Sequence, residues 1–300
     1  MSNLEFTKPD EALRRRLEFL NQDFIPYADT MPGTLIAWWN LYNDLEYAPI
    51  GSSGIVIRSS YLQSGNRVVY TYLGDPGQAS QDIQSIFEYE QSINQERVVY
   101  SVPKYSIEQI RNDFDCENDV DISEYVIDIP LFSELASKDY KKIRRKINKI
   151  RLEYPSLYTK DLVSISHTER EEISNFIKKI PVENDIDDDE NRVMLESLDK
   201  LDMYDLKVSC IYNDDEIVAV CMYKNAPHGH VNINHIRADH KYPHSFLYAL
   251  HELAIKLGKE GFSHMNIEQD LGLEGLRTFK SRLHPSMMLE KYTVRPRKDP

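Results

Sequence analysis

Apolar residues recur along most of the chain with the periods of strands and helices. In the second half, short apolar runs fit strands, and longer stretches with apolar residues every three or four positions fit helices. The pattern predicts strands at 206–212, 216–223, 231–238 and 265–268, and helices at 191–202, 245–259 and 272–283. Gly261 follows the helix at 245–259 and is a typical helix stop. This half therefore combines a hairpin-rich sheet with covering helices.

The first half offers a similar order of elements. Strands at 54–58 and 67–73 flank Ser64-Gly65-Asn66, a hairpin turn signal. The pattern then predicts helices at 80–93 and 106–114 and strands at 97–102 and 125–130. We expect an α/β (α+β) fold in which each half has a mainly antiparallel mixed sheet covered by helices. No residue-level repeat links the halves, so an internal duplication rests on element order alone.

The length of the chain fits two domains. It has 300 residues, of which 41% are hydrophobic and 28% charged. These values are typical of folded proteins, and 300 residues suit two cores of about 150 residues each. We expect an N-terminal domain at 1–130, a linker helix at 131–155 and a C-terminal domain at 156–300.

The expected linker contains an amphipathic helix at 132–154 that is strongly basic on its polar side. Its apolar positions are spaced by three and four residues, at Tyr140, Ile143, Ile147, Ile150 and Tyr154. Eight Lys or Arg residues and a single acid lie between positions 138 and 151, a local charge of +7. The net charge of the chain is −13, so the other residues sum to −20.

This basic face suggests an anion-binding site. A solvated helix face usually mixes charges of both signs, whereas this one is almost purely cationic in an acidic protein. The expected ligand-binding residues are Lys141, Lys142, Arg145 and Lys149, and the anion would be a tRNA backbone, the phosphates of CoA or a phospholipid head. The alternative is an ordinary amphipathic helix between domains.

Nothing in the sequence predicts export or membrane insertion. The N-terminus lacks an apolar segment of signal-peptide length, and no apolar run approaches the ~20 residues of a spanning helix. The three cysteines form no C-x-x-C pair, which favours reduced thiols. We therefore expect a soluble cytoplasmic protein without a transmembrane segment.

The segment 268–280 carries charged residues at a predicted strand-to-helix junction. Glu268 ends the strand, Asp270 lies where the helix begins, and Arg277 and Lys280 share a face of that helix. These four side chains are candidates for a common site. The alternatives are that Asp270 only caps the helix and that the two cations form a solvated face. Gly272 and Gly275, expected in the first turns, suggest a close approach by backbone or ligand.

Two further elements hold candidate residues. His235, in the middle of the strand at 231–238, is a candidate general base, although the sequence favours a buried core histidine with satisfied hydrogen bonds. Arg237 on the same strand is a candidate for substrate binding. No zinc-type spacing of Cys and His occurs, so no metal site is predicted. The acidic segment 183–190 is predicted to be a solvated loop.

The C-terminal residues resemble a known family. Asn266, Asp270-Leu271-Gly272, Gly275-Leu276-Arg277, Lys280, Pro285 and Lys291-Tyr292 match the pattern of the phosphatidylglycerol lysyltransferase C-terminal domain family. Looser similarities involve Trp39-Asn40-x-Tyr42, the strand at 67–74, the basic helix and the segment 235–239. The resemblance implies two fused GNAT-like domains, and the family's best-known members transfer an aminoacyl group from charged tRNA to a lipid.

The donor implied by the resemblance is an aminoacyl-tRNA or an acyl-CoA, with no permanently bound cofactor. Acetyltransferases hold the CoA pyrophosphate on a glycine-rich turn before a helix. The corresponding stretch 237–245 contains no glycine, and Leu73-Gly-Asp-Pro-Gly77 in the first half is more typical of a turn. This favours aminoacyl-tRNA, with the basic helix as a binding surface for tRNA.

The expected function is therefore acyl transfer, most specifically aminoacyl transfer to an amine or hydroxyl on a small molecule, peptide or lipid head. We expect Asp270 and His235 to be catalytic. We expect Glu268, Arg237, Arg277 and Lys280 to bind the substrate, with Arg277 and Lys280 neutralising negative charge. The alternatives are an acyl-CoA-dependent N-acyltransferase and a degenerate, non-catalytic GNAT pair that only binds a ligand or partner.

Overall fold

The structure is a computed structural model that describes residues 4–31, 33–37, 45–60, 68–162, 164–181 and 185–297. Trp39, Asn40, Tyr42 and the predicted turn Ser64-Gly65-Asn66 lie outside these ranges. The strands are β1 Glu46–Ile50, β2 Gly54–Ser60, β3 Val68–Leu73, β4 Val99–Pro103, β5 Phe114–Asp128, β6 Leu157–Leu162, β7 Lys207–Asn213, β8 Glu216–Asn225, β9 His230–Ala238, β10 His264–Gln269 and β11 Met287–Pro296.

The described helices lie before and between runs of these strands. They are α1 Glu11–Asp23, α3 Ala79–Ser92, α4 Lys104–Ile110, α5 Ile129–Glu134, α6 Lys141–Glu153, α7 His167–Lys179, α8 Asp185–Asp199, α9 Leu201–Tyr204, α10 Ser245–Lys259 and α11 Glu274–Ser281, with short 3₁₀ helices η1 Ala28–Thr30 and η3 Pro76–Gln78. None of these described helices is long and apolar enough to cross a membrane.

The strands follow the hydrogen-bonded order β1-β2-β3-β4-β11-β5-β10-β9-β8-β7-β6. Most pairings are antiparallel, and β3–β4 and β9–β10 are parallel. The predicted fold class, a mixed α/β fold with a mainly antiparallel sheet covered by helices, is confirmed.

The chain divides into two compact units. Unit 1 contains Met1–Glu124, Gln269–Glu274 and Met288–Pro300, and unit 2 contains Tyr125–Glu268 and Gly275–Met287. This division differs from the predicted one in two respects. The last strand, β11, pairs with β4 and so returns to unit 1. The basic helix α6 is part of unit 2 instead of standing between the units.

The sheet of unit 1 is covered on both faces around β2, where Ile55, Val56 and Ile57 form a continuous apolar run. In β2, Ile55 and Ile57 belong to the cluster of buried residues that includes the leucines of α1. Val56, between them, belongs to the cluster formed with α3 and α4. The period of two in a strand sends neighbouring side chains to opposite faces, so a continuous apolar run produces a sheet between two layers of helices.

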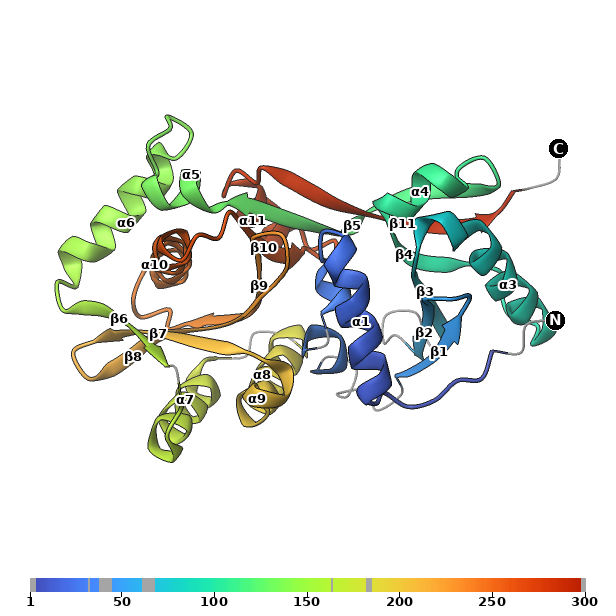
Figure 1. Cartoon of the computed structure of the whole chain (residues 1–300). Helices are drawn as coiled ribbons and strands as arrows, with labels where there is room; N and C mark the ends of the chain where they lie inside the picture. The colour runs from blue at the N-terminus through green and yellow to red at the C-terminus, as the bar shows by residue number, and fades with distance from the viewer. Residues whose placement is uncertain are drawn as a thin grey trace. The chain divides into compact units, whose positions relative to one another are not determined.

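Unit 2 follows the same logic around β8, where seven consecutive residues from Val218 to Lys224 are buried. Helix α10 packs on one face of this strand and α7 on the other. In Figure 1 the strands of this unit lie between α10 on one side and α7 and α8 on the other. A β-bulge in β9 changes its alternation, because Met222 pairs with His235 while Tyr223 pairs with Ile233. His235 and Arg237 therefore lie on the face covered by α8.

Two local predictions were wrong. The predicted helix at 132–154 is two helices, α5 and α6, because Leu135 has a left-handed backbone with φ 51° and ends α5. The Arg144 guanidinium donates to the carbonyls of Leu135 and Ser137 and stabilises the connection. The acidic segment predicted as a loop forms the start of α8 from Asp185 onward, where negative charge favours the N-terminal end of a helix.

Candidate functional site

The parallel strands β9 and β10 separate near their carboxyl ends. Their paired positions run from His230–His264 to Asn232–Asn266, whereas β9 continues to Ala238 and β10 to Gln269. In open α/β sheets, ligands commonly bind outside the carboxyl ends of parallel strands. The end of β10 is where the sequence predicted a cluster of charged side chains.

Glu268 has a strained backbone at this position. Its φ is +60°, a left-handed conformation that is uncommon for residues other than glycine. Two asparagines hold it in place: the Asn266 carboxamide accepts from the Glu268 N–H at 2.8 Å, and the Asn232 amide donates to its carboxylate at 3.0 Å. Both asparagines are buried and Glu268 is half-buried. Such strain often persists where a side chain must be aimed at a ligand.

Asp270 lies in the turn that follows, and its side chain is completely buried. Its carboxylate accepts from the Gly272 N–H at 2.9 Å, and its carbonyl accepts from the Leu273 N–H at 3.0 Å. Helix α11 begins only at Glu274, so Gly272 precedes the helix that was expected to contain it. Its φ of +73° and the proximity of Asp121 both require glycine, since an added Cβ would lie 2.9 Å from a carboxylate oxygen.

Lys280 connects α11 to the end of β10. Its ammonium is buried, donates to the Ile267 carbonyl at 2.6 Å and lies 6.0 Å from the centre of the Tyr125 ring. Arg277, one turn earlier, is half-buried. The structure thus brings Lys280 next to the backbone that carries Glu268. The lysine neutralises the partial negative charge of a carbonyl at this junction.

His235 lies beneath helix α8 and is 3% exposed. Its Nε2 is 3.2 Å from the Ser197 hydroxyl. Burial, together with the charge of Arg237, lowers the pKa of His235 to about 3. The imidazole is therefore neutral near pH 7. A group with such a low pKa accepts protons weakly at this pH, so His235 is an inefficient general base.

Arg237, two residues further along β9, is held by the start of α8. Its guanidinium donates to the Asn191 side-chain carbonyl at 2.8 Å and forms an ion pair with Glu190 at 3.0 Å. The side chain is 14% exposed. The acidic segment of α8 thus serves partly to compensate this arginine.

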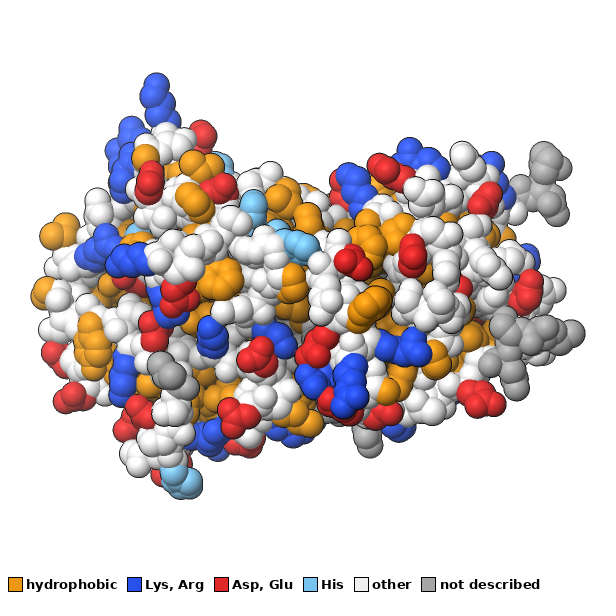
Figure 2. Space-filling model, in the orientation of Figure 1, with side chains coloured by type: hydrophobic (Ala, Val, Ile, Leu, Met, Phe, Trp, Pro, Cys, Tyr) orange, Lys and Arg blue, Asp and Glu red, His pale blue; other side chains and the backbone are white. Residues whose placement is uncertain are grey.

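The basic face of α6 is exposed as predicted from its sequence. Ile143, Ile147 and Ile150 are buried against unit 2. Lys149 forms an ion pair with Glu153 at 3.6 Å. Four exposed cations have no acidic partner among the described residues: Lys141, Lys142, Arg145 and Lys146. Figure 2 shows Lys and Arg side chains gathered at the upper left, where Figure 1 places the connection from α5 and the start of α6.

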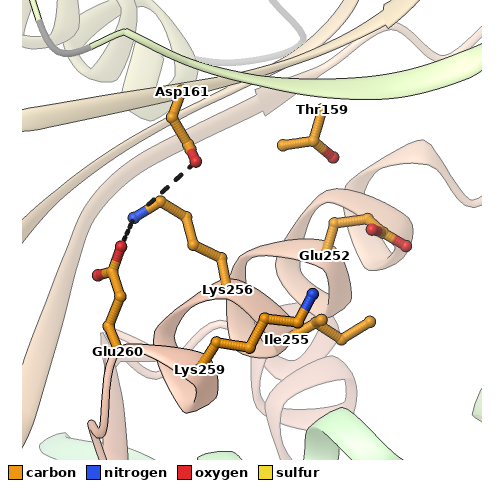
Figure 3. A pocket seen from close by; sticks show the side chains of 7 residues that line it. All are labelled: Thr159, Asp161, Glu252, Ile255, Lys256, Lys259 and Glu260. Atoms are coloured by element: carbon orange, nitrogen blue, oxygen red, sulfur yellow. Dashed lines mark hydrogen bonds and ion pairs between the residues drawn. The ribbon is translucent and has the colours of Figure 1, made fainter.

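An open groove of about 340 Å³ lies elsewhere in unit 2, between β6 and α10. Its lining contains charges of both signs, and Figure 3 shows Lys256 between Asp161 and Glu260. Lys256 also donates to the Tyr223 hydroxyl at 2.9 Å. None of the predicted site residues lines this groove, and its central cation is already compensated.

Several polar residues that the sequence did not predict to be site residues are buried in the two units. In unit 2 they include Asn232, Asn266 and Lys224. In unit 1, the Lys291 ammonium lies 2.6 Å from carboxylate oxygens of both Asp29 and Glu124. The side chains of Lys291 and Glu124, which lie on strands of the sheet, are almost completely buried. A signal was available, since polar residues interrupt strand patterns that are otherwise apolar. Among the described residues, no group of three or more His, Cys, Asp and Glu side chains is placed to hold a metal ion.

Comparison with known proteins relates most of the chain to one family. The model for "Phosphatidylglycerol lysyltransferase, C-terminal" matches residues 24–295. A conserved protein of unknown function from Bacteroides thetaiotaomicron has a TM-score of 0.83 at 19% identity, covering 98% of this chain and 100% of that one. L-PGS from Bacillus licheniformis has a TM-score of 0.65 at 13% identity, covering 97% and 93%.

A third solved structure is the C-terminal domain of a putative lysylphosphatidylglycerol synthetase from Agrobacterium fabrum. Its TM-score is 0.65 at 11% identity, covering 94% of this chain and 91% of that one. Among curated protein sequences, none is significantly similar. At these identities the solved structures establish a shared fold along nearly the full length of the chain.

Proposed function

The chain belongs to the phosphatidylglycerol lysyltransferase C-terminal family, and from this we propose that it is an acyltransferase that takes an aminoacyl group from aminoacyl-tRNA. The acceptor would be an amine or hydroxyl on a small molecule, peptide or lipid head. The observation that carries the choice of donor is the exposed cationic face of α6 in a protein whose net charge is −13. Such a face suits a polyanionic phosphate backbone.

The two loops where CoA phosphates would be expected favour the same donor. Between β9 and α10, the backbone N–H groups of Lys241, Tyr242 and Ser245 already donate within the loop, to Asp239 or to Tyr242. A phosphate cradle needs such groups to point at the ligand. This loop contains no glycine, and α10 begins after His244, whose φ is +73°.

The loop between β3 and α3 in unit 1 is similarly engaged. The N–H of Gly77 donates to the Asp75 carboxylate at 2.7 Å, and the N–H of Gln78 donates to the Asp75 carbonyl at 3.0 Å. Asp-Pro-Gly here forms a capped turn, in which negative charge from Asp75 also disfavours an incoming phosphate. These contacts support aminoacyl-tRNA over acyl-CoA.

In the proposed reaction, Glu268 orients the acceptor and receives its proton. The acceptor nitrogen or oxygen attacks the carbonyl carbon of the aminoacyl ester and forms a new bond to it. The ester bond to the terminal ribose then breaks, and the ribose oxygen leaves with a proton passed on by Glu268. Most of the rate would come from positioning and from stabilising the charge that develops on the carbonyl oxygen.

The other predicted residues receive supporting roles in this proposal. His235, which was expected to be catalytic, is buried and contacts Ser197, so we assign it to shaping the site. Asp270, also expected to be catalytic, is buried and accepts from the Gly272 N–H, so we assign it to stabilising its own turn in unit 1. Arg237 anchors β9 to α8. Lys280 holds the end of β10 in place. Arg277 is the cation proposed to face negative charge on the donor or acceptor.

Incubation with a panel of charged tRNAs and acyl-CoAs, followed by mass spectrometry of acceptors, tests the donor. We expect products that carry an amino acid and none that carry an acyl group from CoA. A product formed from acyl-CoA alone would contradict the choice of donor. The loop between β9 and α10, which contains Asp239, provides a further check. Substitutions in this loop should leave the rate of aminoacyl transfer unchanged, because the loop is not proposed to bind the donor.

A binding protein without catalysis is the second candidate function. It is favoured by the complete burial of Asp270 and the low pKa of His235, which leave few groups suited to proton transfer. In that case charged tRNA would bind, with a salt-dependent affinity, and would be recovered with its amino acid still attached. Turnover of any donor in the panel would exclude this candidate.

A further inference from the structure

Lys224 differs from the other buried lysines among the described residues. Lys280 and Lys291 each have an oxygen partner at 2.6 Å. Lys224 is 9% exposed, and its ammonium lies 3.5 Å from the Tyr204 carbonyl and 3.6 Å from the Asp205 carboxylate. An ammonium has three donors, and taking a charge out of water is unfavourable unless close partners replace the solvent.

The available partners compensate Lys224 poorly. The 3.5 Å contact is at the outer limit of a hydrogen bond. The Asp205 side chain is 77% exposed, and an ion pair with such a solvated group contributes little. The site therefore holds a buried cation whose hydrogen-bonding capacity is not met by the closest oxygens of the protein.

The position of Lys224 relates it to the candidate site. It pairs directly with Asn232 across β8 and β9, so the two side chains lie on the same face of the sheet. The amide of Asn232 in turn donates to the carboxylate of Glu268. An ammonium, a carboxamide and a carboxylate thus follow one another on this face, all within unit 2.

We propose that Lys224 binds an anionic oxygen of the ligand, such as that of a phosphate or carboxylate group, next to Asn232 and Glu268. The inference rests on the proposed function for the identity of that ligand, in which the phosphate of the donor's terminal nucleotide is the natural source. The anion-binding role itself follows from the burial and the long contacts of Lys224. A bound anionic oxygen supplies the close partner that the ammonium lacks.

Anion binding by three purified proteins tests this inference: the unmodified chain, Lys224→Met and Lys207→Met. Lys207 is exposed at the neighbouring end of β7, so its variant matches the change in net charge. Each protein is titrated with inorganic phosphate and, separately, with acetate, at constant ionic strength, and the melting temperature is recorded. Any phosphate bound by α6 is common to all three proteins.

We expect a saturable rise in melting temperature for the unmodified protein and for Lys207→Met, and at least a roughly tenfold weaker apparent affinity for Lys224→Met. A response to phosphate alone identifies a phosphate ligand, and a response to acetate identifies a carboxylate ligand. Equal responses of all three proteins, or no response of the unmodified protein to either anion, would overturn the inference.

The ligand-free melting temperature gives a second readout. Since the partners of Lys224 are distant, Lys224→Met should melt within a few degrees of the unmodified protein or above it. Lys291→Met should melt well below it. A comparably large loss of stability in Lys224→Met would show a structural ion pair and overturn the inference. If the anion response depends on Lys224 while no donor is turned over, the proposed function fails and the anion site stands.

Discussion

His230 and His235 belong to strand β9, and both are buried in unit 2. Burial lowers the pKa of His230 to about 4, with further contributions from His264 and His228. The His230 and His264 rings stack with centroids 4.7 Å apart. Sequence reasoning identified His235 as a candidate base, but the pattern of a strand cannot reveal how completely a neighbouring helix desolvates a ring.

These histidines should make stability depend on pH. The folded pKa of His235 is about 3, whereas an unfolded histidine titrates near 6.5. Between these values the unfolded chain binds a proton that the folded chain excludes. Stability therefore decreases as pH falls below about 6.5, by about 1.4 kcal/mol per pH unit for each full proton.

Urea unfolding at a series of pH values between about 7 and about 5 measures this slope. His235→Gln should reduce the slope by close to one proton's contribution. His240→Gln, which changes an exposed histidine in the loop after β9, serves as the matched control and should leave it unchanged. Parallel slopes for the unmodified protein and His235→Gln would show that His235 already titrates normally in the folded state.

At the scale of elements, helices and strands with strong apolar periodicity were predicted correctly from the sequence, whereas elements rich in charged residues were not. Helix α10 occupies the predicted range 245–259, and β8 extends the predicted strand by two residues. The first part of β5 was missed because Asp115, Glu117 and Asp119 have low strand propensity. Its neighbour β11 lies at the other end of the chain, and such distant pairing leaves no local signal.

The turn before α11 offers a matched pair of glycine substitutions. Gly272→Ala should destabilise the protein by about 1–2 kcal/mol, since φ is +73° and the new Cβ would crowd Asp121. Gly275→Ala, in the first turn of α11 with no atom within 4 Å of an added Cβ, should stabilise it by up to about 1 kcal/mol. Chemical denaturation measures both. Equal effects of the two substitutions would mean that the turn adopts another conformation.

Helix α6 should provide much of the affinity for tRNA. Replacing Lys142, Arg145 and Lys149 with Ala removes three cations from its face. If each contacts a phosphate, the slope of log affinity against log salt should decrease by about 0.7–0.9 per lost contact. Lys178, Lys179 and Lys207 are exposed on other elements of unit 2, and their triple Ala variant has the same net charge.

Titration of labelled tRNA at several salt concentrations compares the two triple variants. We expect weaker binding and a flatter salt dependence only for the α6 variant. The same loss in both variants would indicate that overall charge, and not the α6 face, attracts the tRNA.

At the scale of the whole molecule, the sequence predicted two α/β halves and the family, but not how the chain is divided between the units. The basic helix suggested a domain boundary near 131–155. The return of β11 to pair with β4, by contrast, depends on contacts between residues nearly 200 positions apart in the sequence. Likewise, the residues at the end of β10 were identified from their charges. Their partners Asn232 and Ile267 are revealed only by the folded chain.

The central claim is that aminoacyl transfer takes place beside Glu268. The most direct measurement is the single-turnover rate at which a labelled amino acid moves from charged tRNA to an acceptor. The acceptor is one identified by mass spectrometry in the incubations with the panel of donors. The rate is compared for the unmodified protein, Glu268→Gln and Glu274→Gln. Glu274 is an exposed carboxylate in the first turn of α11, so it controls for the loss of one charge.

We predict that Glu268→Gln lowers the transfer rate by about 100-fold or more, the usual contribution of a positioned proton acceptor, while tRNA affinity and the rate of Glu274→Gln stay near those of the unmodified protein. Transfer by Glu268→Gln at the rate of the unmodified protein would contradict the account.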